Sequence, residues 1–371
     1  MKIQAAIVKS ANSQYEIVEL DLADLQDDEV RVRIVATGIC HSDDLLRLGQ
    51  VPFPLPAVLG HEGAGVVEQV GTNVRNVKVG DHVVLAYAYC QHCRHCRQGM
   101  PAACESWMQL NWGARRDDGA TSFRIDNGVE VNNFFHQSSF ASFTNVKEQN
   151  IIVVPKDVDL RILGPLGCGL MTGAGTVLKG LDVKAGSSIA IFGVGAVGMA
   201  ALMAAKIAGA SVIVALDIHE SRLEIAKELG ATHIISSKTD DPLTKILEIT
   251  GGKGVNYSVE TTGISAVIKT SIDALALCGT VAPIAGTNQN LTINTFTDFV
   301  MSSKRMIGVV MGATIPQIGI IDLINYYKAG KFPYDKLIKI YDFSEINQAS
   351  SDSLSGKTIK PILIVDKNYA A

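Results

Sequence analysis

The first third of the chain repeats short segments in which apolar and polar residues alternate. Between positions 30 and 34 the apolar residues Val, Val and Ile fall on one face, and two arginines fall on the other. A period of two is typical of a strand with one buried face. Glycine-bounded apolar segments such as residues 65–71 repeat the pattern. We therefore predict a twisted, largely antiparallel β domain that reaches about residue 160, with a boundary near Gly164 and Pro165.

The pattern then changes to short apolar strands separated by segments of helix length. Residues 189–192 and 212–216 are continuous apolar runs, and an Ala- and Met-rich segment at 196–208 lies between them. A second helix ends at Gly230, and a third begins at Asp241-Pro242, where a capping side chain precedes a first-turn proline. Further strands are predicted over residues 255–259, 280–284 and 307–311. Because helices connect these strands, we expect a doubly wound, parallel-sheet α/β domain.

The C-terminal part contains one predicted helix around residues 320–327 and one strand at residues 361–365. We expect this part to rejoin the first domain. A chain of 371 residues exceeds the size at which a single core stops growing, so two domains are expected. The predicted division assigns residues 1–165 and 313–371 to one domain and residues 166–312 to the other.

Composition restricts the partners that the protein can have. Hydrophobic residues make up 47% of the chain, charged residues 19%, and the net charge is −4. The sequence has no dense block of Lys and Arg, so we expect no nucleic-acid partner, whose phosphates require a concentrated basic face.

Hydropathy bears on location. The N-terminal residues lack the apolar run of a signal peptide. The stretch between Lys184 and Lys206 is uncharged, but glycines interrupt it and it begins as a buried strand rather than a membrane helix. We expect no membrane partner and a cytoplasmic location, where thiols remain reduced.

Four closely spaced cysteines indicate a metal site. They are Cys90, Cys93, Cys96 and Cys104. Thiolates are soft ligands, structural zinc prefers four of them in a tetrahedron, and two-residue gaps let one loop direct three sulfurs at a common point. Disulfides and incidental thiols are the alternatives, but disulfides require an oxidising compartment. We predict a structural zinc in a lobe at about residues 88–106.

A glycine-rich motif between a predicted strand and a predicted helix indicates a dinucleotide site. It consists of Gly193, Val194, Gly195, Ala196, Val197 and Gly198. Glycines in this G-x-G-x-x-G pattern let the backbone approach a pyrophosphate at a helix N-terminus. Asp217 closes the next strand, where its carboxylate can bind the adenosine ribose and repel the 2′-phosphate of NADP. We therefore favour NAD; Arg222 is expected beside the ribose, and it leaves room for some use of NADP.

The remaining cysteines suggest a second metal site. Cys40 and Cys168 each lie beside glycine, as does His61. A Cys, His, Cys set leaves one zinc position open, which is the condition for a catalytic metal. Each residue alone is more often a buried side chain than a ligand, so only the combination favours a site. His41 is the alternative to His61, and Glu62 is a ligand or a supporting group.

These motifs resemble those of a known family. Residues 60–71, GHEGAGVVEQVG, match the signature of zinc-containing alcohol dehydrogenases of the medium-chain dehydrogenase/reductase superfamily. The four-cysteine lobe, the turn at residues 38–43 and the glycine motif follow in that family's order. The chain resembles the family over nearly its whole length, and most of all aryl-alcohol dehydrogenases such as benzyl alcohol dehydrogenase.

The resemblance implies a GroES-like catalytic domain, a Rossmann cofactor domain, NAD and two zinc ions per subunit. Cys40, His61 and Cys168 would hold the catalytic zinc, with Glu62 close behind it. Ser42 would contact the substrate oxygen. The implied cofactor contacts are His41 near the pyrophosphate, Thr172 near the nicotinamide, and Lys360 as a basic contact.

One position departs from the family pattern. Leu45 stands where liver-type members carry a histidine that ends a proton relay. Leucine cannot accept a proton, so the relay from Ser42 must continue through cofactor hydroxyls, water or another group.

The implied reaction is the reversible oxidation of a primary, aromatic alcohol to its aldehyde. Alternatives are an S-(hydroxymethyl)glutathione dehydrogenase, a general aliphatic alcohol dehydrogenase and, without catalysis, a zinc-binding nucleotide-sensing module.

Apolar segments near Val309 and Met311 suggest sheet extension between subunits, and related enzymes form dimers or tetramers. Six aromatic residues cluster in the first domain, where a few could line an aromatic pocket and core packing is expected for most: Tyr87, Tyr89, Trp107, Trp112, Phe134 and Phe135.

Overall fold

The computed structural model describes residues 1–125 and 128–370 and divides into two compact units. The first unit contains residues 1–168 and 315–322 and the chain from residue 335 onward. The second unit contains residues 169–314 and 323–334. The divisions predicted from the sequence fall after residues 165 and 312. The prediction also places residues 323–334 in the first domain, whereas in the structure they belong to the second unit.

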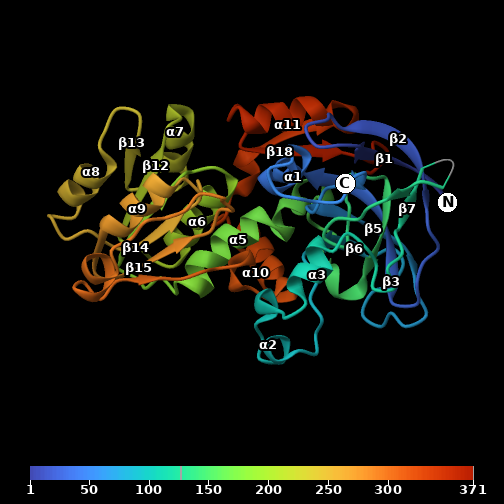
Figure 1. Cartoon of the computed structure of the whole chain (residues 1–371), viewed down its shortest axis with the longest axis horizontal. Coiled ribbons are helices and arrows are strands. Elements are labelled where there is room, and N and C mark those ends of the chain that lie inside the picture. The colour runs from blue at the N-terminus through green and yellow to red at the C-terminus, as the bar shows by residue number, and fades with distance from the viewer. Residues whose placement is uncertain (126–127, 371) are drawn as a thin grey trace. The chain divides into compact units, whose positions relative to one another are not determined.

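A six-stranded parallel sheet forms the second unit (Figure 1). Its strands are β11 (Ser188–Phe192), β12 (Val212–Asp217), β13 (His233–Ser236), β14 (Val255–Glu260), β15 (Leu275–Pro283) and β16 (Arg305–Met306). The order across the sheet is β13-β12-β11-β14-β15-β16, so the direction of winding reverses between β11 and β14. This is the Rossmann order, in which ligands bind beyond the carboxyl ends of the strands at the point of reversal.

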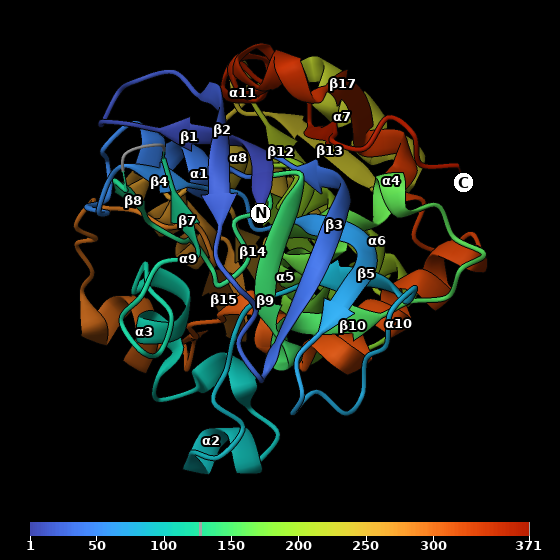
Figure 2. The same cartoon turned by 90° about the vertical axis from the view of Figure 1, so that its right-hand side faces the viewer.

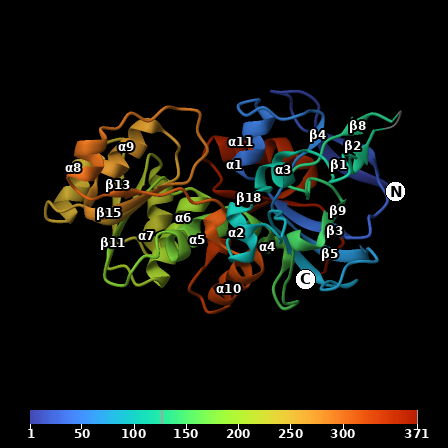
Figure 3. The same ribbon diagram turned by 60° about the horizontal axis from the view of Figure 1, so that its bottom comes forward.

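Helices cover both faces of this sheet. They are α6 (Ala196–Ile207), α7 (Glu220–Leu229), α8 (Pro242–Ile249) and α9 (Ser265–Asp273). Figure 3 shows α8 and α9 on one side of the sheet and α6 and α7 on the other. Phe192 and Leu216 of the sheet are buried in one cluster with Ile246 of α8 and Ile272 of α9. The predicted doubly wound sheet is therefore confirmed.

The predicted strand at residues 307–311 is wrong. The sheet ends at β16, and Met311–Ala313 forms a 3-10 turn (η6) in which Met311, Gly312 and Ala313 have φ of 47°, 67° and 50°. Three successive residues with positive φ are incompatible with a strand. The segment near Val309 and Met311 is thus not a strand edge of the kind invoked for subunit pairing.

Two largely antiparallel sheets form the first unit (Figure 2). One contains β3 (Glu29–Gly38), β5 (Gly63–Val70), β6 (His82–Leu85), β9 (Phe143–Lys147), β10 (Ile151–Val153), β17 (Ile338–Asp342) and β18 (Lys360–Ile364). The other contains β1 (Lys2–Val8), β2 (Glu16–Leu22), β4 (Ala57–Val58), β7 (Phe123–Arg124) and β8 (Glu130–Val131). Val30, Val32 and Ile34 of β3 are buried in the core, as their alternation predicts. Strand β18 pairs with β3, so the strand predicted at residues 361–365 belongs to a sheet of the first unit.

Helices are short in the first unit. They are α1 (His41–Arg47), α2 (Arg94–Arg97), α3 (Trp107–Trp112), α4 (Leu160–Leu163) and α11 (Ile346–Leu354). The second unit also contains α5 (Gly169–Gly175), and the unit division falls within α10 (Pro316–Lys328). Irregular helical turns are η1 (Pro101–Ala103), η2 (Glu148–Asn150), η3 (Gly164–Gly167), η4 (Thr176–Gly180), η5 (Phe296–Val300), η7 (Tyr334–Leu337) and η8 (Phe343–Glu345). Within the described ranges, none of the helices combines the length and apolar character needed to cross a bilayer.

Candidate active site and metal centres

Three side chains from distant parts of the first unit meet in its interior. Cys40 precedes α1, His61 precedes β5, and Cys168 follows η3. Their two sulfurs and one ring nitrogen lie within 4.8 Å of one another and are buried, although Cys40 as a whole residue is partly exposed. The Nε2 atom of His61 is buried with no hydrogen-bond partner among the described residues. This soft donor set and its free nitrogen fit a zinc ion with one open position.

The two thiols of this cluster share a hydrogen bond. That bond lowers the pKa of Cys40, and the positive charges of His61 and Lys360 add to the lowering against the effect of burial. The same bond and burial raise the pKa of Cys168. The two shifts are opposite in direction because the thiols are so close together. A divalent cation would hold both sulfurs deprotonated, because thiolates are the form that binds metal.

Asp43, on α1, orients the histidine of this cluster. Its Oδ1 atom accepts hydrogen bonds from Nδ1 of His61 and from the amide of Gly60, both at 3.0 Å. Its Oδ2 atom accepts from the amide of Cys40 at 3.1 Å. Burial acts to lower the pKa of His61, but the carboxylate of Asp43 and the thiolate of Cys40 raise it. A proton held on Nδ1 leaves Nε2 as the atom that faces a metal.

Behind the cluster lies a buried ion pair. Lys360, on β18, donates from Nζ to Oε1 and Oε2 of Glu62 at 3.0 and 2.9 Å and to the carbonyl of Ile39 at 3.1 Å. Burial raises the pKa of Glu62 and Lys360 opposes the rise, whereas Glu62 raises the pKa of Lys360 against the effect of burial. A side chain at Gly38 would overlap Oε2 of Glu62, so glycine is required there.

Lys360 is therefore placed differently from the expected basic cofactor contact. Its ammonium group is buried and bonded to Glu62 and a backbone carbonyl, which makes it the counter-ion of the carboxylate behind the zinc ligands. A contact with the cofactor stays a prediction. Glu62 bonds to the ammonium group of Lys360, and its position behind a catalytic zinc stays a prediction.

Aromatic rings pack directly on the candidate zinc ligand. The ring centroid of His61 lies 5.2 Å from that of Phe134 and 4.8 Å from that of Phe135. Trp112 stacks edge-on against Phe134 at 5.6 Å, and Phe53 does so at 5.4 Å. Phe135 has a φ of 56°, a backbone conformation that bulky residues rarely adopt. Sequence analysis assigned most of these residues to core packing, and nothing local in the sequence indicates that they pack on His61.

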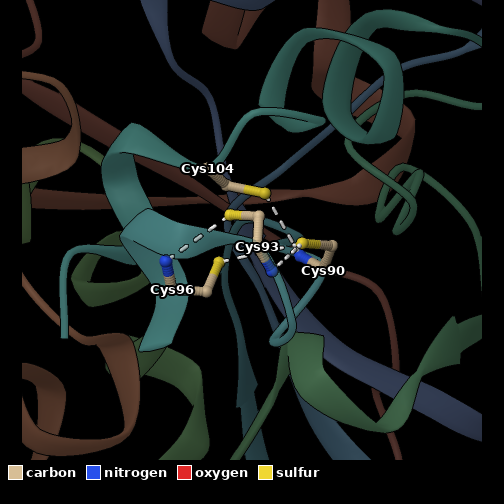
Figure 4. Close-up of side chains that lie close together, drawn as sticks. All are labelled: Cys90, Cys93, Cys96 and Cys104. Carbon is tan, nitrogen blue, oxygen red and sulfur yellow. Dashed lines mark hydrogen bonds between the residues drawn. The ribbon is translucent and has the colours of Figure 1, made fainter. Parts of the chain in front are cut away.

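The four-cysteine lobe brings its sulfurs together as well. All four sulfurs lie within 4.8 Å of one another and point toward a common centre (Figure 4). The amides of Cys93 and Cys96 donate to the sulfurs of Cys90 and Cys93 at 3.3 and 3.5 Å, and the amide of Cys90 donates to Cys104 at 3.3 Å. The amides of Cys96 and Glu105 lower the pKa of Cys93 to about 6. All seven cysteines of the chain are free, and the convergence of four sulfurs in the lobe fits a closed zinc site.

In the second unit, the glycine motif connects β11 to α6. Gly193 has a φ of 86°, and a side chain at Gly198 would overlap the carbonyl of Gly193. A side chain at Gly195 would meet only Arg222, at 3.9 Å, so the surface there is open. No side chain caps the start of α6, and its first amides have no partners within the helix. The turn fits a phosphate group, which such amides bind.

Asp217 and Arg222 lie next to this turn. One carboxylate oxygen of Asp217 accepts from the amide of Val194 at 2.9 Å, and the other accepts from the amide of His219 at 2.9 Å. A guanidinium nitrogen of Arg222 lies 3.8 Å from Asp217. Its Nε atom is buried and unpartnered within the described residues. The structure thus brings together the motif, the acid and the arginine that sequence analysis selected for the adenosine end of a dinucleotide.

The other predicted residues are divided between the units. His41 is the first residue of α1 and is exposed, and Ser42 follows it with its Oγ 3.9 Å from Sγ of Cys40. Thr172 lies on α5 in the second unit, with its hydroxyl 3.9 Å from the sulfur of Met311. Asp43, Phe134 and Phe135 are the residues of this region that sequence analysis did not select.

Comparisons with known proteins agree with the fold and with the donor sets. Residues 26–156 match the family "Alcohol dehydrogenase GroES-like domain", and residues 196–325 match the family "Zinc-binding dehydrogenase". Geraniol dehydrogenase of Castellaniella defragrans is 37% identical, covering 97% of this chain and 97% of that protein.

Two crystal structures are similar throughout. An alcohol dehydrogenase zinc-binding domain protein from Burkholderia ambifaria has a TM-score of 0.96 at 47% identity and covers 99% of both chains. Benzyl alcohol dehydrogenase from Acinetobacter calcoaceticus has a TM-score of 0.94 at 44% identity over 99% of this chain and 100% of that one. The chain belongs to the zinc-dependent alcohol dehydrogenases of the medium-chain dehydrogenase/reductase superfamily.

Membership confirms the predicted combination of a GroES-like domain and a Rossmann-type domain. It makes the protein an oxidoreductase that acts on alcohols, with zinc and a nicotinamide dinucleotide as cofactors.

Proposed function

We propose that the protein reversibly oxidises a primary alcohol, whose carbinol carbon is bonded to an aromatic ring, to the corresponding aldehyde with NAD. The observation that supports this most directly is the packing of Phe134 and Phe135 against His61, itself one of three buried donors that fit a catalytic zinc. Aromatic side chains favour flat, unsaturated groups through offset and edge-to-face contacts. We expect the ring of the substrate to pack near these side chains.

Each group of the site has a separate task in this proposal. Cys40, His61 and Cys168 hold the zinc, which when bound supplies a Lewis acid that lowers the pKa of an alcohol. Asp43 fixes the tautomer of His61. The ammonium group of Lys360 neutralises the carboxylate of Glu62, the residue next to His61 in the chain. Ser42 takes the proton of the alcohol. Leu45 has no titratable group, so the proton leaves Ser42 by another route.

The proposal includes two zinc ions per chain and NAD rather than NADP. The four-cysteine lobe holds the second ion in a closed, structural site. Asp217 supports NAD, because its carboxylate lies beside the turn and would repel a 2′-phosphate. We expect kcat/KM to favour NAD over NADP by at least about tenfold. Arg222 offers a positive charge to a 2′-phosphate, so we expect measurable activity with NADP as well. Equal values for the two cofactors would contradict this assignment.

Two relatives have names that are consistent with this substrate class. One is a benzyl alcohol dehydrogenase and the other a geraniol dehydrogenase. Benzyl alcohol and geraniol are both primary alcohols with a π system next to the carbinol carbon. General aliphatic alcohols and the glutathione adduct of formaldehyde lack that feature.

Steady-state kinetics with benzyl alcohol, hexanol and S-(hydroxymethyl)glutathione separate the candidates. We expect kcat/KM for benzyl alcohol to exceed that for hexanol by about tenfold or more, since aromatic pairs add to ordinary burial. Phe135→Leu should reduce this ratio toward one, while Phe332→Leu, a buried phenylalanine of the second unit, should leave it unchanged. Benzyl alcohol as the poorest of the three substrates would overturn the aryl assignment.

The non-catalytic alternative makes a different prediction. A zinc-binding nucleotide sensor would contain one zinc per chain and show no NADH formation with any alcohol. Metal analysis and absorbance at the NADH band decide this point. The complete Cys40, His61 and Cys168 set supports the enzyme.

We also propose a cytoplasmic homodimer or homotetramer. Free thiols at both metal sites fit a reducing compartment. Large apolar side chains are exposed on neighbouring parts of the second unit, namely Leu277, Phe296, Val300, Met301 and Met306. Such groups favour subunit association. Light scattering of the purified chain measures the assembly, and a monomer at micromolar concentration would exclude it.

A further inference from the structure

The hydroxyl of Thr261 holds the carbonyl of Gly193. Gly193 follows β11 and Thr261 follows β14, so the bond crosses the point where the order of the strands reverses. Thr261 directly follows β14, the neighbour of β11 in the sheet. Its hydroxyl donates to the carbonyl of Gly193 at 2.8 Å and lies 3.1 Å from the carbonyl of Phe192. Its amide donates to the carbonyl of Phe192 at 2.9 Å. The first glycine of the motif therefore follows β11 in the chain and is hydrogen-bonded to the residue after β14.

The other neighbouring strand holds the same turn from the opposite side. The amide of Gly193 donates to the carbonyl of Leu216 at 2.9 Å, and the amide of Val194 donates to Asp217 at 2.9 Å. One bond to Asp217 and one from Thr261 thus fix the orientation of the peptide between Gly193 and Val194, and the bond to Leu216 fixes the peptide before it. The amides that follow this peptide are the ones a pyrophosphate would meet.

Space around Gly193 is limited by the same threonine. A side chain at Gly193 would come within 2.6 Å of the hydroxyl of Thr261 and 2.9 Å of the methyl group of Thr262. The carbonyl of Gly193 also contacts the backbone of Gly198, where a side chain would overlap it. A shift of this carbonyl would therefore move the start of α6.

A buried carboxylate holds Thr261 in place. Glu260 is the last residue of β14 and is fully buried. Its carboxylate accepts from the amide of Thr262 at 2.6 Å, from the hydroxyl of Thr262, and from the amide of Gly263 at 3.2 Å. These bonds close a tight turn after β14, so the position of Thr261 is determined by the chain on both sides.

We propose that Thr261 is a positioning residue for the dinucleotide, which holds the glycine turn in the form that receives the pyrophosphate, with Glu260 fixing the position of Thr261. The inference rests on the use of a dinucleotide at this turn. Loss of the hydroxyl leaves the Gly193 carbonyl without its partner and lets the turn relax before the cofactor binds. Cofactor affinity should therefore change, while the chemistry of the alcohol should not.

The test measures the dissociation constant of NADH by fluorescence titration and amide hydrogen exchange at Val194 and Gly195 in the cofactor-free, zinc-loaded protein. Thr261→Val replaces the hydroxyl with a methyl group of similar size and should weaken NADH binding about tenfold, with faster exchange at these amides. Thr261→Ser keeps the hydroxyl and should restore binding to within about twofold. At saturating NAD, kcat of Thr261→Val should stay within about twofold, since the bond is made with or without alcohol.

Thr270→Val is the matched control, because its hydroxyl bonds to a helix carbonyl, that of Ala266, at 3.0 Å within the same unit. It should leave NADH binding unchanged. Glu260→Gln, which keeps the shape of the side chain, provides a second variant if Thr261→Val does not fold, and it should weaken NADH binding about threefold. Unchanged NADH affinity in Thr261→Val, or equal loss in Thr261→Val and Thr261→Ser, would overturn the inference. If the unaltered protein fails to bind NADH, the proposed function fails instead.

Discussion

The two cysteine sites of the first unit are built in opposite ways. The four candidate ligands of the lobe come from residues 90–104, and the backbone amides of the same loop bond to the sulfurs. The three candidate ligands of the buried site are residues 40, 61 and 168, and carboxylates and a lysine surround them. A local site needs only a loop, whereas the dispersed site needs the folded sheet.

Burial explains why the supporting groups differ. Three of the four cysteines of the lobe are partly exposed and Cys104 is buried. Backbone amides lower the pKa of Cys93, whereas burial raises the pKa of Cys96 and of Cys104. The dispersed site is enclosed, so each charge there requires a partner: Asp43 for His61 and Lys360 for Glu62. The dispersed site should accordingly be the more sensitive to changes in residues that do not touch the metal.

The strongest test removes a ligand of the dispersed site. Cys168→Ser should lower kcat by more than about a thousandfold, because even outer partners of metal ligands cost about 10- to 100-fold. Zinc content should fall by up to one ion per chain. Steady-state rates and metal analysis measure both effects. Cys278→Ser, at an exposed position of β15, should retain rate and zinc, and a similar loss there would show general damage instead.

The corresponding change in the lobe should act on stability. Cys104→Ser removes a buried ligand and should lower the free energy of unfolding by about 3 kcal/mol or more, since structural zinc binding contributes to folding. Urea unfolding measures this. The folded fraction should keep its kcat within about twofold. Ser106→Ala, whose side chain caps no helix, is the control, and unchanged stability in Cys104→Ser would argue against a structural metal.

A smaller effect separates ligand from support. Asp43→Asn should reduce kcat/KM or zinc affinity about 10- to 100-fold, because asparagine has one acceptor oxygen and no charge, so it cannot accept from His61, Gly60 and Cys40 together. Chelator competition measures the affinity. Asp44→Asn, on the same helix, alters bonds to Arg47 and Ser350 instead and should keep its zinc. Equal losses of zinc affinity in both variants would show that Asp43 does not orient His61.

The mildest test compares thiol reactivity in zinc-free protein. The pKa of Cys93 is about 6, so its thiolate forms, and its alkylation by iodoacetamide accelerates, as pH rises through about 6. An ordinary thiol shows this rise near pH 8.5. Mass spectrometry of peptides gives the rate for each cysteine. A midpoint near 8.5 for Cys93 would mean that the amides of the loop do not stabilise its thiolate.

Much of the second unit could be predicted from the sequence because its strands are buried on both faces and its helices have clear ends. Asp241 caps α8 through the amide of Thr244 at 2.8 Å, as the Asp-Pro pair indicated. The glycine motif, Asp217 and Arg222 are likewise close in sequence and space. The strand predicted at residues 307–311 failed because an apolar run does not reveal the positive φ values at η6.

The dispersed site could be predicted only in part. Cys40, His61 and Cys168 were selected because metal chemistry requires such ligands. Phe134 and Phe135 were not selected, since aromatic residues serve any core and only the folded chain brings them onto His61. Asp43 is visible near Cys40, but its bond to His61 depends on how the loop before β5 returns.

The ion pair between Glu62 and Lys360 joins residues separated by 298 positions, and Lys360 lies on the last strand. During synthesis the metal-binding side chains are therefore made long before the cation that neutralises the carboxylate behind them. Until β18 pairs with β3, that carboxylate has to stay hydrated or take up a proton. A fragment ending before residue 360 would contain all seven donors of the two proposed zinc sites and would lack the cation that neutralises Glu62.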